Sequence, residues 1–254
     1  MSDQNIYDNP VFFEGYRRLR ENPLAANTVI EKPALFSLCP DFACQAVLDL
    51  GCGCGENCRT IAEAGAKAVV GVDISQKMLA VAKAENNAEN VRFVEMSMTD
   101  LSGLQGRFDV ILSSLAVHYI EDFGQLLGHV YRLLAEDGLF VFSQEHPLTT
   151  ALTKDDYWHR DEAGVAQHYK LTDYGRPGVR QTNWIVEGVV KYHRTFGDIV
   201  NALTDAGFVI EAMLEPMPEE AVMKQDESYR KYYHKPDFLL IRARKSMKNV
   251  GKET

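Results

Sequence analysis

The sequence predicts a doubly wound α/β domain, in which helices cover both faces of a mostly parallel sheet. From residue 46 onward, short apolar runs alternate with amphipathic helical stretches, the pattern of successive β-α-β units. The runs are continuously apolar rather than alternating, which is typical of strands covered on both faces. With 254 residues, 46% of them apolar and 25% charged, the chain can bury a core without disulfides or a structural metal. One large domain, or one domain with an embellishment, fits this length.

The first half of the domain consists of five expected strands with helices between them. The strands are expected at residues 46–50, 68–72, 91–94, 108–113 and 139–143. Cys58, Ile61, Ala62 and Gly65 mark the apolar face of the first helix, and Ser75 is the expected N-cap of the second. Residues 123–134 repeat apolar side chains at helical spacing and predict the strongest helix.

The alternation of predicted strands and helices ends after the fifth strand. Residues 144–192 mix glycine and proline with aromatics, which predicts loops and a short antiparallel hairpin inserted at this point. A capping box of Thr195 and Asp198 then begins a helix that Gly207 ends, and strands are expected at 208–214 and 238–243. Residues 1–45 form an expected N-terminal helical leader packed across the top of the domain. Residues 46–245 are then the domain itself, and 246–254 are expected to be a disordered tail.

Charge and composition exclude several classes of partner. A net charge of -9 and a pI near 5.3 oppose binding to nucleic acid or to anionic membranes, and the basic stretch 242–252 is typical of a frayed, solvated end. No apolar run reaches membrane-spanning length, and the polar start does not resemble a signal peptide, so we expect a cytoplasmic protein.

The five cysteines all lie between residues 39 and 58. An odd number argues against a disulfide framework. The spacing of Cys52, Cys54 and Cys58, with no cysteine after them, argues against a metal site. We therefore expect reduced thiols and no bound metal.

The most informative stretch lies between the first strand and the first helix. Asp49, Gly51, Gly53 and Gly55 form the pattern D-x-G-x-G-x-G, and such glycines let the backbone approach a ligand. Asp73 follows at the end of the next strand, where a carboxylate can accept both hydroxyls of a ribose. A dinucleotide fingerprint would place its third glycine at position 56, which is Glu56.

On these residues the chain resembles class I S-adenosylmethionine-dependent methyltransferases, and more closely their small-molecule branch of ubiquinone and biotin biosynthesis-like enzymes. Further matching segments span about residues 46 to 143: Ile74 to Leu79, the F-D-x-V of Phe108 to Ile111, the run Ser113 to Ile120, and Leu133 to Leu139, with Asp137 in place of a glycine. Asp109 of the F-D-x-V motif is expected to be structural.

The resemblance implies a Rossmann-like sheet of seven strands with one antiparallel strand, and methyl transfer to a small molecule by in-line displacement. It implies S-adenosylmethionine as cofactor and S-adenosylhomocysteine as product. The cofactor-binding residues that it implies are Asp49, Gly51, Cys52, Gly53, Asp73, Ile74, Ser97, Met98, Ser113 and, from the leader, Tyr16. Ser97 and Met98 depart from the family, which has an acidic residue and alanine there, so Asp100 is an alternative contact for the adenine amine.

Three histidines follow strands or the insertion and are candidate general bases: His118 first, then His146 and His193. The alternative is that they only hydrogen-bond to loops. The aromatic residues of 144–192 form either a satellite apolar cluster or a substrate lid that closes together with the leader. Arg160, Arg180 and Arg194 suggest an acceptor with a carboxylate or phosphate.

Two other function classes remain open at this point. One is a noncatalytic S-adenosylmethionine-binding protein, and the other is an NAD-dependent oxidoreductase, which Glu56 disfavours. The sequence sets neither the identity of the acceptor nor the oligomeric state.

Overall fold

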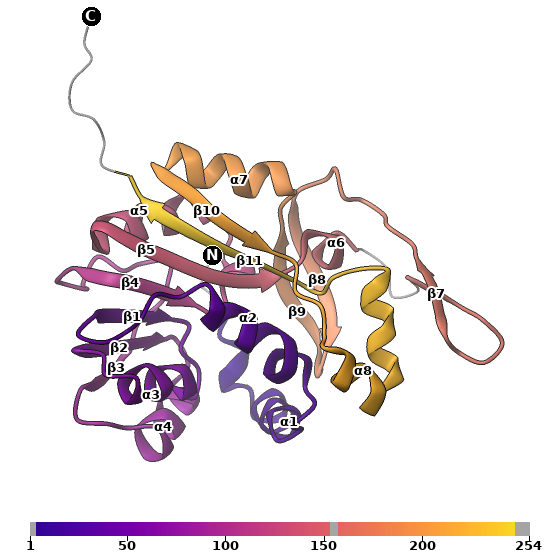
Figure 1. Cartoon of the computed structure of the whole chain (residues 1–254), viewed down its shortest axis with the longest axis horizontal. Helices are drawn as coiled ribbons and strands as arrows, with labels where there is room; N and C mark the ends of the chain where they lie inside the picture. Colours follow the sequence, from indigo (N-terminus) through magenta and orange to yellow (C-terminus); the bar gives the residue numbers. More distant parts are fainter. Residues whose placement is uncertain (1–3, 153–156, 247–254) are drawn as a thin grey trace, which may run out of the picture.

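A seven-stranded sheet forms the centre of the molecule and has the order β10-β11-β5-β4-β1-β2-β3. The structure is a computed structural model and describes residues 4–152 and 157–246. Figure 1 shows the strands side by side, with helices on both faces of the sheet. The sheet strands are β1 (Ala46–Leu50), β2 (Ala68–Asp73), β3 (Val91–Glu95), β4 (Phe108–Ser113), β5 (Leu134–Glu145), β10 (Phe208–Leu214) and β11 (Phe238–Lys245).

Strand directions match the predicted fold class. The pairs β1–β2, β1–β4, β2–β3 and β4–β5 are parallel, whereas β11 pairs antiparallel with both β5 and β10. The prediction of a mostly parallel seven-stranded sheet with one antiparallel strand is therefore confirmed. The chain order reverses between β1 and β4, and such a reversal opens a ligand crevice at the carboxyl ends of the strands.

Local sequence signals set where the helices begin. Ser75 caps α4 (Gln76–Glu85) by accepting the N–H of Met78, and Thr195 and Asp198 form the expected capping box of α7 (Phe196–Asp205). The other helices of the sheet layers are α3 (Glu56–Glu63) and α5 (Phe123–Leu133). Gly65, expected on the apolar face of the first helix, instead lies beyond the end of α3 with a φ of +89°, a conformation that glycine tolerates.

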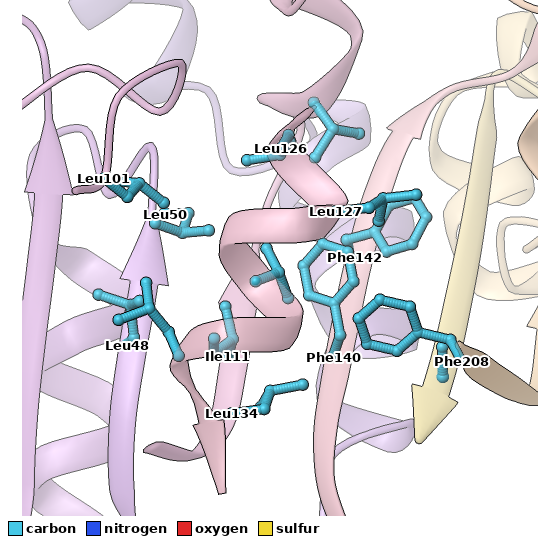
Figure 2. Close-up of a cluster of buried hydrophobic side chains, with 14 of the residues drawn as sticks. Leu48, Leu50, Leu101, Ile111, Leu126, Leu127, Leu134, Phe140, Phe142 and Phe208 are labelled. Carbon is cyan, nitrogen blue, oxygen red and sulfur yellow. The ribbon is translucent and has the colours of Figure 1, made fainter. Parts of the chain in front are cut away.

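Two apolar clusters cover the two faces of the sheet. One packs α5 and α7 against the strands and contains most of the large side chains of Figure 2, such as Leu48, Ile111, Leu127, Phe140 and Phe142. The other packs α3, α4, α2 (Lys32–Ser37) and the segment α8 (Glu220–Gln225) with η4 (Glu227–Tyr233) against the opposite face. In strands such as β1, β4 and β5, alternate residues belong to the two clusters, which explains the continuous apolar runs in the sequence.

The leader and the insertion lie next to the crevice. The described part of the leader forms η1 (Ile6–Asp8), α1 (Pro10–Arg20), η2 (Asn27–Glu31) and α2. Within the described insertion the chain forms α6 (Pro147–Thr150) and two hairpins rather than the single hairpin expected: β6 (Trp158–Arg160) with β7 (Ala166–Tyr169), and β8 (Gly178–Trp184) with β9 (Val186–His193). The short helix η3 (Val117–Tyr119) follows β4.

The chain end differs from expectation in one respect. The last strand was expected at 238–243, but β11 extends to Lys245, into the stretch 242–252 that was expected to be frayed. Within it, Arg242 and Arg244 pair with Glu211 of β10. These ion pairs neutralise basic side chains of a strand that lies between β10 and β5 in the sheet. The expected disordered tail, apart from Ser246, lies outside the described residues.

Candidate functional site

The glycine loop after β1 is held close to β2 and presents open backbone to solvent. The N–H groups of Gly51 and Cys52 both donate to the carbonyl of Val72. Gly51 has a φ of +71°, and a Cβ built on it would lie 2.5 Å from the Cβ of Ala116, so this position requires glycine. Gly53 also has a positive φ, but a Cβ there would meet nothing within 4 Å. This edge of the loop therefore borders space that a ligand can occupy.

Asp73, at the carboxyl end of β2, holds the loop from the other side. Its Oδ2 accepts the N–H of Gly53 at 2.8 Å, and its Oδ1 accepts the N–H of Ser75 at 2.8 Å. Each carboxylate oxygen can accept a second hydrogen bond, so both can also meet ligand hydroxyls. Burial raises the pKa of Asp73, against the lowering effect of the two backbone donors.

A single cavity of about 630 Å³ opens between the glycine loop, the leader and the carboxyl ends of β4 and β5. We call this space the central cavity. Seven of the predicted cofactor-binding residues line it, namely Gly51, Cys52, Gly53, Asp73, Ile74, Ser97 and Met98, and an eighth is Tyr16 of the leader. Asp100, the alternative adenine contact, does not line it and instead accepts the N–H of Ser102.

Aromatic side chains from the leader and the β8–β9 hairpin meet over the central cavity. Trp184, at the tip of the hairpin, contacts Phe12 and Tyr16 of α1 edge to face, with ring centroids 5.3 and 6.2 Å apart. Tyr7 of η1 contacts Tyr16 and also contacts Tyr119 of η3, which follows β4. These contacts join three segments far apart in sequence, and all but Phe12 of these residues line the cavity.

His118 is the one predicted base that lines the central cavity. Its Nδ1 accepts the N–H of Glu145 at 3.4 Å, and burial lowers the pKa of the imidazole to about 4. The ring is therefore neutral at pH 7, and its hydrogen lies on Nε2. A neutral ring of this tautomer donates a hydrogen bond from Nε2 and cannot take a proton there. The structure thus favours a donor role over the expected role as base.

His146 and His193 lie outside the lining of the cavity. His146 caps α6 through Nδ1 and contacts Glu215 through Nε2 at 2.8 Å. His193 is enclosed between the Thr150 hydroxyl and the Tyr174 carbonyl. Both rings use both nitrogens to hold loops together, the alternative that the sequence left open, so neither is placed to act as a base on a ligand in the cavity.

Two predicted cofactor residues also lie behind the cavity rather than in its lining. The carboxylate of Asp49 is 1% exposed and accepts the thiol of Cys58 on α3, and burial raises its pKa to about 7. The hydroxyl of Ser113 donates to the Leu50 carbonyl and joins β4 to β1. Both residues support the glycine loop from beneath. Asp109 is structural, as expected, because it accepts the N–H of Ala46.

The three arginines predicted to clamp an anionic acceptor all donate to backbone carbonyls of the protein. Arg180 donates to the carbonyls of Ala151 and Arg176, and Arg194 donates to those of Ile120 and Glu121. Arg160 donates to Gly164, in its own hairpin. Outside this set, Arg20 and Lys32 of the leader line the cavity beside Glu56, at the start of α3.

Among the acidic residues that line the cavity and that sequence reasoning missed, Glu31 and Glu145 lie beside the carboxyl ends of β4 and β5. Glu31 accepts the hydroxyls of Ser114 and Ser143, and burial raises its pKa. Burial acts to raise the pKa of Glu145 too, but the Lys191 ammonium, 2.5 Å from its Oε1, lowers it overall. The one available signal was the presence of a charged residue inside or directly after an apolar run, as in Val29-Ile30-Glu31.

All five cysteines are free, and the described residues contain no cluster of three metal-binding side chains. Among the helices of residues 4–152 and 157–246, none is long and apolar enough to cross a membrane.

Comparison with known proteins agrees with this geometry. Residues 47–138 match the model of a methyltransferase domain family. A solved S-adenosylmethionine-dependent methyltransferase from Mesorhizobium loti is 38% identical, with a TM-score of 0.79, over 87% of this chain and 98% of that one. The chain belongs to the S-adenosylmethionine-dependent methyltransferases. The predictions of class I membership and of S-adenosylmethionine as the cofactor are thereby confirmed.

Two sequence relatives are similar over different lengths. An uncharacterized protein of Haemophilus influenzae is 38% identical over 95% of this chain and 97% of its own length. A malonyl-[acyl-carrier protein] O-methyltransferase of Bacillus anthracis is 32% identical over 48% of each chain. Of the two, the relative with a known reaction is similar to only about half of this methyltransferase.

Proposed function

We propose that this methyltransferase transfers the methyl group of S-adenosylmethionine to a small molecule inside the central cavity. The observation that carries the proposal is the joint lining of one cavity by the glycine loop with Asp73 and by polar side chains after β4 and β5. A volume of about 630 Å³ is in the range of small-ligand pockets. The aromatic contacts over the cavity favour a small acceptor rather than a polymer, which needs an open track.

The cofactor fits the half of the cavity beside β1 and β2. Asp73 would hold the ribose hydroxyls, and the open edge at Gly53 would lie along the cofactor. Ser97 and Met98, after β3, would border the adenine. Arg20, beside Glu56 at the start of α3, is a cation suited to the carboxylate of the cofactor.

Bound S-adenosylmethionine supplies a methyl group that its sulfonium already activates. The chain's own contribution is then to place the acceptor atom in line with the carbon–sulfur bond and to exclude water. His118 would assist by donating from Nε2 to an oxygen of the acceptor. The leader and the β8–β9 hairpin would act as a lid, because Trp184 and Tyr16 pack together above the cavity.

Transfer of a labelled methyl group tests the proposal. The protein would be incubated with S-adenosylmethionine that carries a tritiated methyl group, together with the two fractions of a cell extract separated by desalting: the macromolecules and the low-mass compounds. We expect label in the low-mass fraction, and none with Asp73→Ala. Label confined to protein or nucleic acid would contradict a small acceptor, and calorimetric binding of S-adenosylhomocysteine without transfer to any fraction would indicate a noncatalytic binding protein.

The lid has its own readout. Hydrogen exchange at residues 7–20 and 178–193 should slow when S-adenosylhomocysteine binds, because closing a lid protects its backbone amides. Exchange that is the same with and without the ligand in both segments would contradict the lid.

A further inference from the structure

Glu31 is a buried carboxyl group that forms no ion pair with any of the described residues. It is the last residue of the π-helical turn η2, is 2% exposed, and lines the central cavity. Short π-helical turns interrupt a helix at some cost and are frequent at functional sites. The turn carries Glu31 from the leader to the carboxyl ends of β4 and β5.

Hydrogen bonds fix how this carboxyl group is oriented. The Ser143 hydroxyl accepts the N–H of Leu115, so its own hydrogen must be the one donated to Oε1 of Glu31. The Ser114 hydroxyl donates to the same Oε1 at 2.9 Å. In the described part of the chain Oε2 has no hydrogen bond. Oε2 is therefore the oxygen left to face the cavity and the one that can carry a proton.

Glu31 differs from Glu145 in lacking a cationic partner within the part of the chain that the structure describes. Glu145 also lines the cavity, but Lys191 neutralises it directly. No lysine or arginine of the described residues lies within ion-pair distance of Glu31. Arg20 and Lys32 act on it only at longer range and are themselves engaged with Glu56. A buried carboxylate without a partner costs several kcal/mol, so a ligand group that satisfies it is the simplest reason to keep it.

The strand order places Glu31 opposite the ribose. Asp73 stands at the end of β2, on one side of β1, whereas Ser114 and Ser143 belong to the ends of β4 and β5, on the other side. A cofactor held by Asp73 and the glycine loop therefore points its reactive end toward β4. Glu31 lies in the half of the cavity left for the acceptor.

We propose that Oε2 of Glu31 binds the N–H or O–H group of the acceptor and takes its proton during methyl transfer. This inference rests on the proposed function. The lone pair of the acceptor nitrogen or oxygen forms the new bond to the methyl carbon, and the carbon–sulfur bond breaks with its electron pair moving to sulfur. The acceptor proton passes to Oε2, which becomes a carboxylic acid, and sulfur becomes neutral. The group that receives the methyl is then an amine or an alcohol.

A purely structural role for Glu31 makes a different prediction. If its task is only to tie η2 to β4 and β5, Glu31→Gln preserves that task, because an amide oxygen still accepts both serine hydroxyls. The substitution removes the negative charge at Oε2 and little else. Glu63→Gln, an exposed residue of α3 paired with Arg59, is the matched control for loss of one charge.

Sinefungin is a probe that needs no known acceptor. It is an S-adenosylmethionine analogue with an amine-bearing carbon in place of the methylsulfonium, so its amine occupies the position from which the methyl group leaves. Calorimetry would compare sinefungin with S-adenosylhomocysteine on the full chain. We expect sinefungin to bind at least about tenfold more tightly to the wild-type protein and to the Glu63→Gln control, as a charge-assisted hydrogen bond to Oε2 requires.

In Glu31→Gln we expect that preference to fall to about threefold or less, with unchanged affinity for S-adenosylhomocysteine and an unchanged thermal midpoint. Equal preference in Glu31→Gln and wild type, or no preference for sinefungin in wild type, would overturn the role of Glu31 while leaving the proposed function intact. Failure of S-adenosylhomocysteine to bind the wild-type protein would instead remove the proposed function. If Glu31→Gln unfolds, Glu31→Asp replaces it: the shorter side chain keeps the charge but withdraws the carboxylate from the cavity, so the sinefungin preference must fall while the affinity for S-adenosylhomocysteine stays the same. A wild-type preference in a folded Glu31→Asp would count against Oε2.

Discussion

Replacing Asp73 by alanine tests the cofactor half of the cavity. The carboxylate makes two 2.8 Å hydrogen bonds to backbone N–H groups and is 9% exposed, at the lining of the cavity. Hydrogen bonds to a charged group contribute about 1.5 to 3 kcal/mol each. Loss of a bidentate ribose contact, partly offset by water in the variant, should therefore cost about 2 to 4 kcal/mol of binding, or roughly 30- to 1000-fold in affinity.

The same substitution also loosens the loop, because the N–H of Gly53 loses its acceptor. The lost ribose contact and the loosened loop are separated by a double-mutant cycle in which one change is Asp73→Ala and the other is removal of one ribose hydroxyl from the ligand. In wild type, 3′-deoxy-S-adenosylhomocysteine should bind about tenfold or more weakly than S-adenosylhomocysteine, whereas in Asp73→Ala the two should bind within about threefold of each other. Isothermal calorimetry measures all four affinities.

Asp109→Ala is the matched control, since Asp109 also accepts a backbone N–H, that of Ala46, but does not line the cavity. It should lower stability without changing the penalty for the missing hydroxyl. If Asp73→Ala binds S-adenosylhomocysteine within threefold of wild type, or if the deoxy penalty is equal in both proteins, the ribose assignment is refuted.

Three further outcomes follow from the same geometry. Asp49 has a folded pKa of about 7 against its usual 3.8, so its contribution to stability is complete below about pH 4 and lost as the pH rises through 7. Between pH 5 and pH 8, chemical denaturation should show Asp49→Asn gaining about 2 to 3 kcal/mol of stability relative to wild type, and equal changes in both proteins would contradict the raised pKa. Gly51→Ala should lower the thermal midpoint, because an alanine with a positive φ is strained by about 1 to 3 kcal/mol and its Cβ lies 2.5 Å from the Cβ of Ala116. The displaced loop should also bind S-adenosylhomocysteine at least about tenfold more weakly. An affinity equal to that of the wild type would show that the loop adapts. The His118 imidazole should stay neutral with its hydrogen on Nε2 from pH 5.5 to 8 in nitrogen-15 NMR spectra, since burial lowers its pKa to about 4, and a titration midpoint near its ordinary value would restore it as a candidate base.

The sheet could be predicted closely because each strand is buried on both faces and its sequence is continuously apolar. The expected second strand, 68–72, is observed at Ala68–Asp73. The fifth differed more: 139–143 was expected, but the strand runs from Leu134 to Glu145, because Leu134 already pairs with Phe108 before an irregular turn. In that turn Asp137 has a φ of +59°, which gives a physical reason for the glycine that the family has there.

The site was predictable only where it is local in sequence. Gly51, Gly53 and Asp73 act through backbone geometry and strand ends, which a motif records directly. The roles of the histidines depend on hydrogen bonds from distant segments, as when Thr150 and Tyr174 enclose His193. No pattern within a few residues of a histidine records such partners, and so one of the three predicted bases lies at the cavity and two do not.

The two proposed halves of the central cavity come from different parts of the sequence: one lies largely inside the segment that matches the methyltransferase domain and the other largely outside it. The proposed cofactor half is lined by residues between 51 and 98, within the segment that matches the methyltransferase domain, together with Tyr16 and Arg20 of the leader. The proposed acceptor half is lined by Glu31, Glu145 and Trp184, all outside residues 47–138, and by His118 inside them. Relatives that are similar only over the central segment therefore share a way to bind the cofactor and need not share an acceptor. The residues that decide the substrate of this enzyme should be sought in the leader, at the end of β5 and in the β8–β9 hairpin.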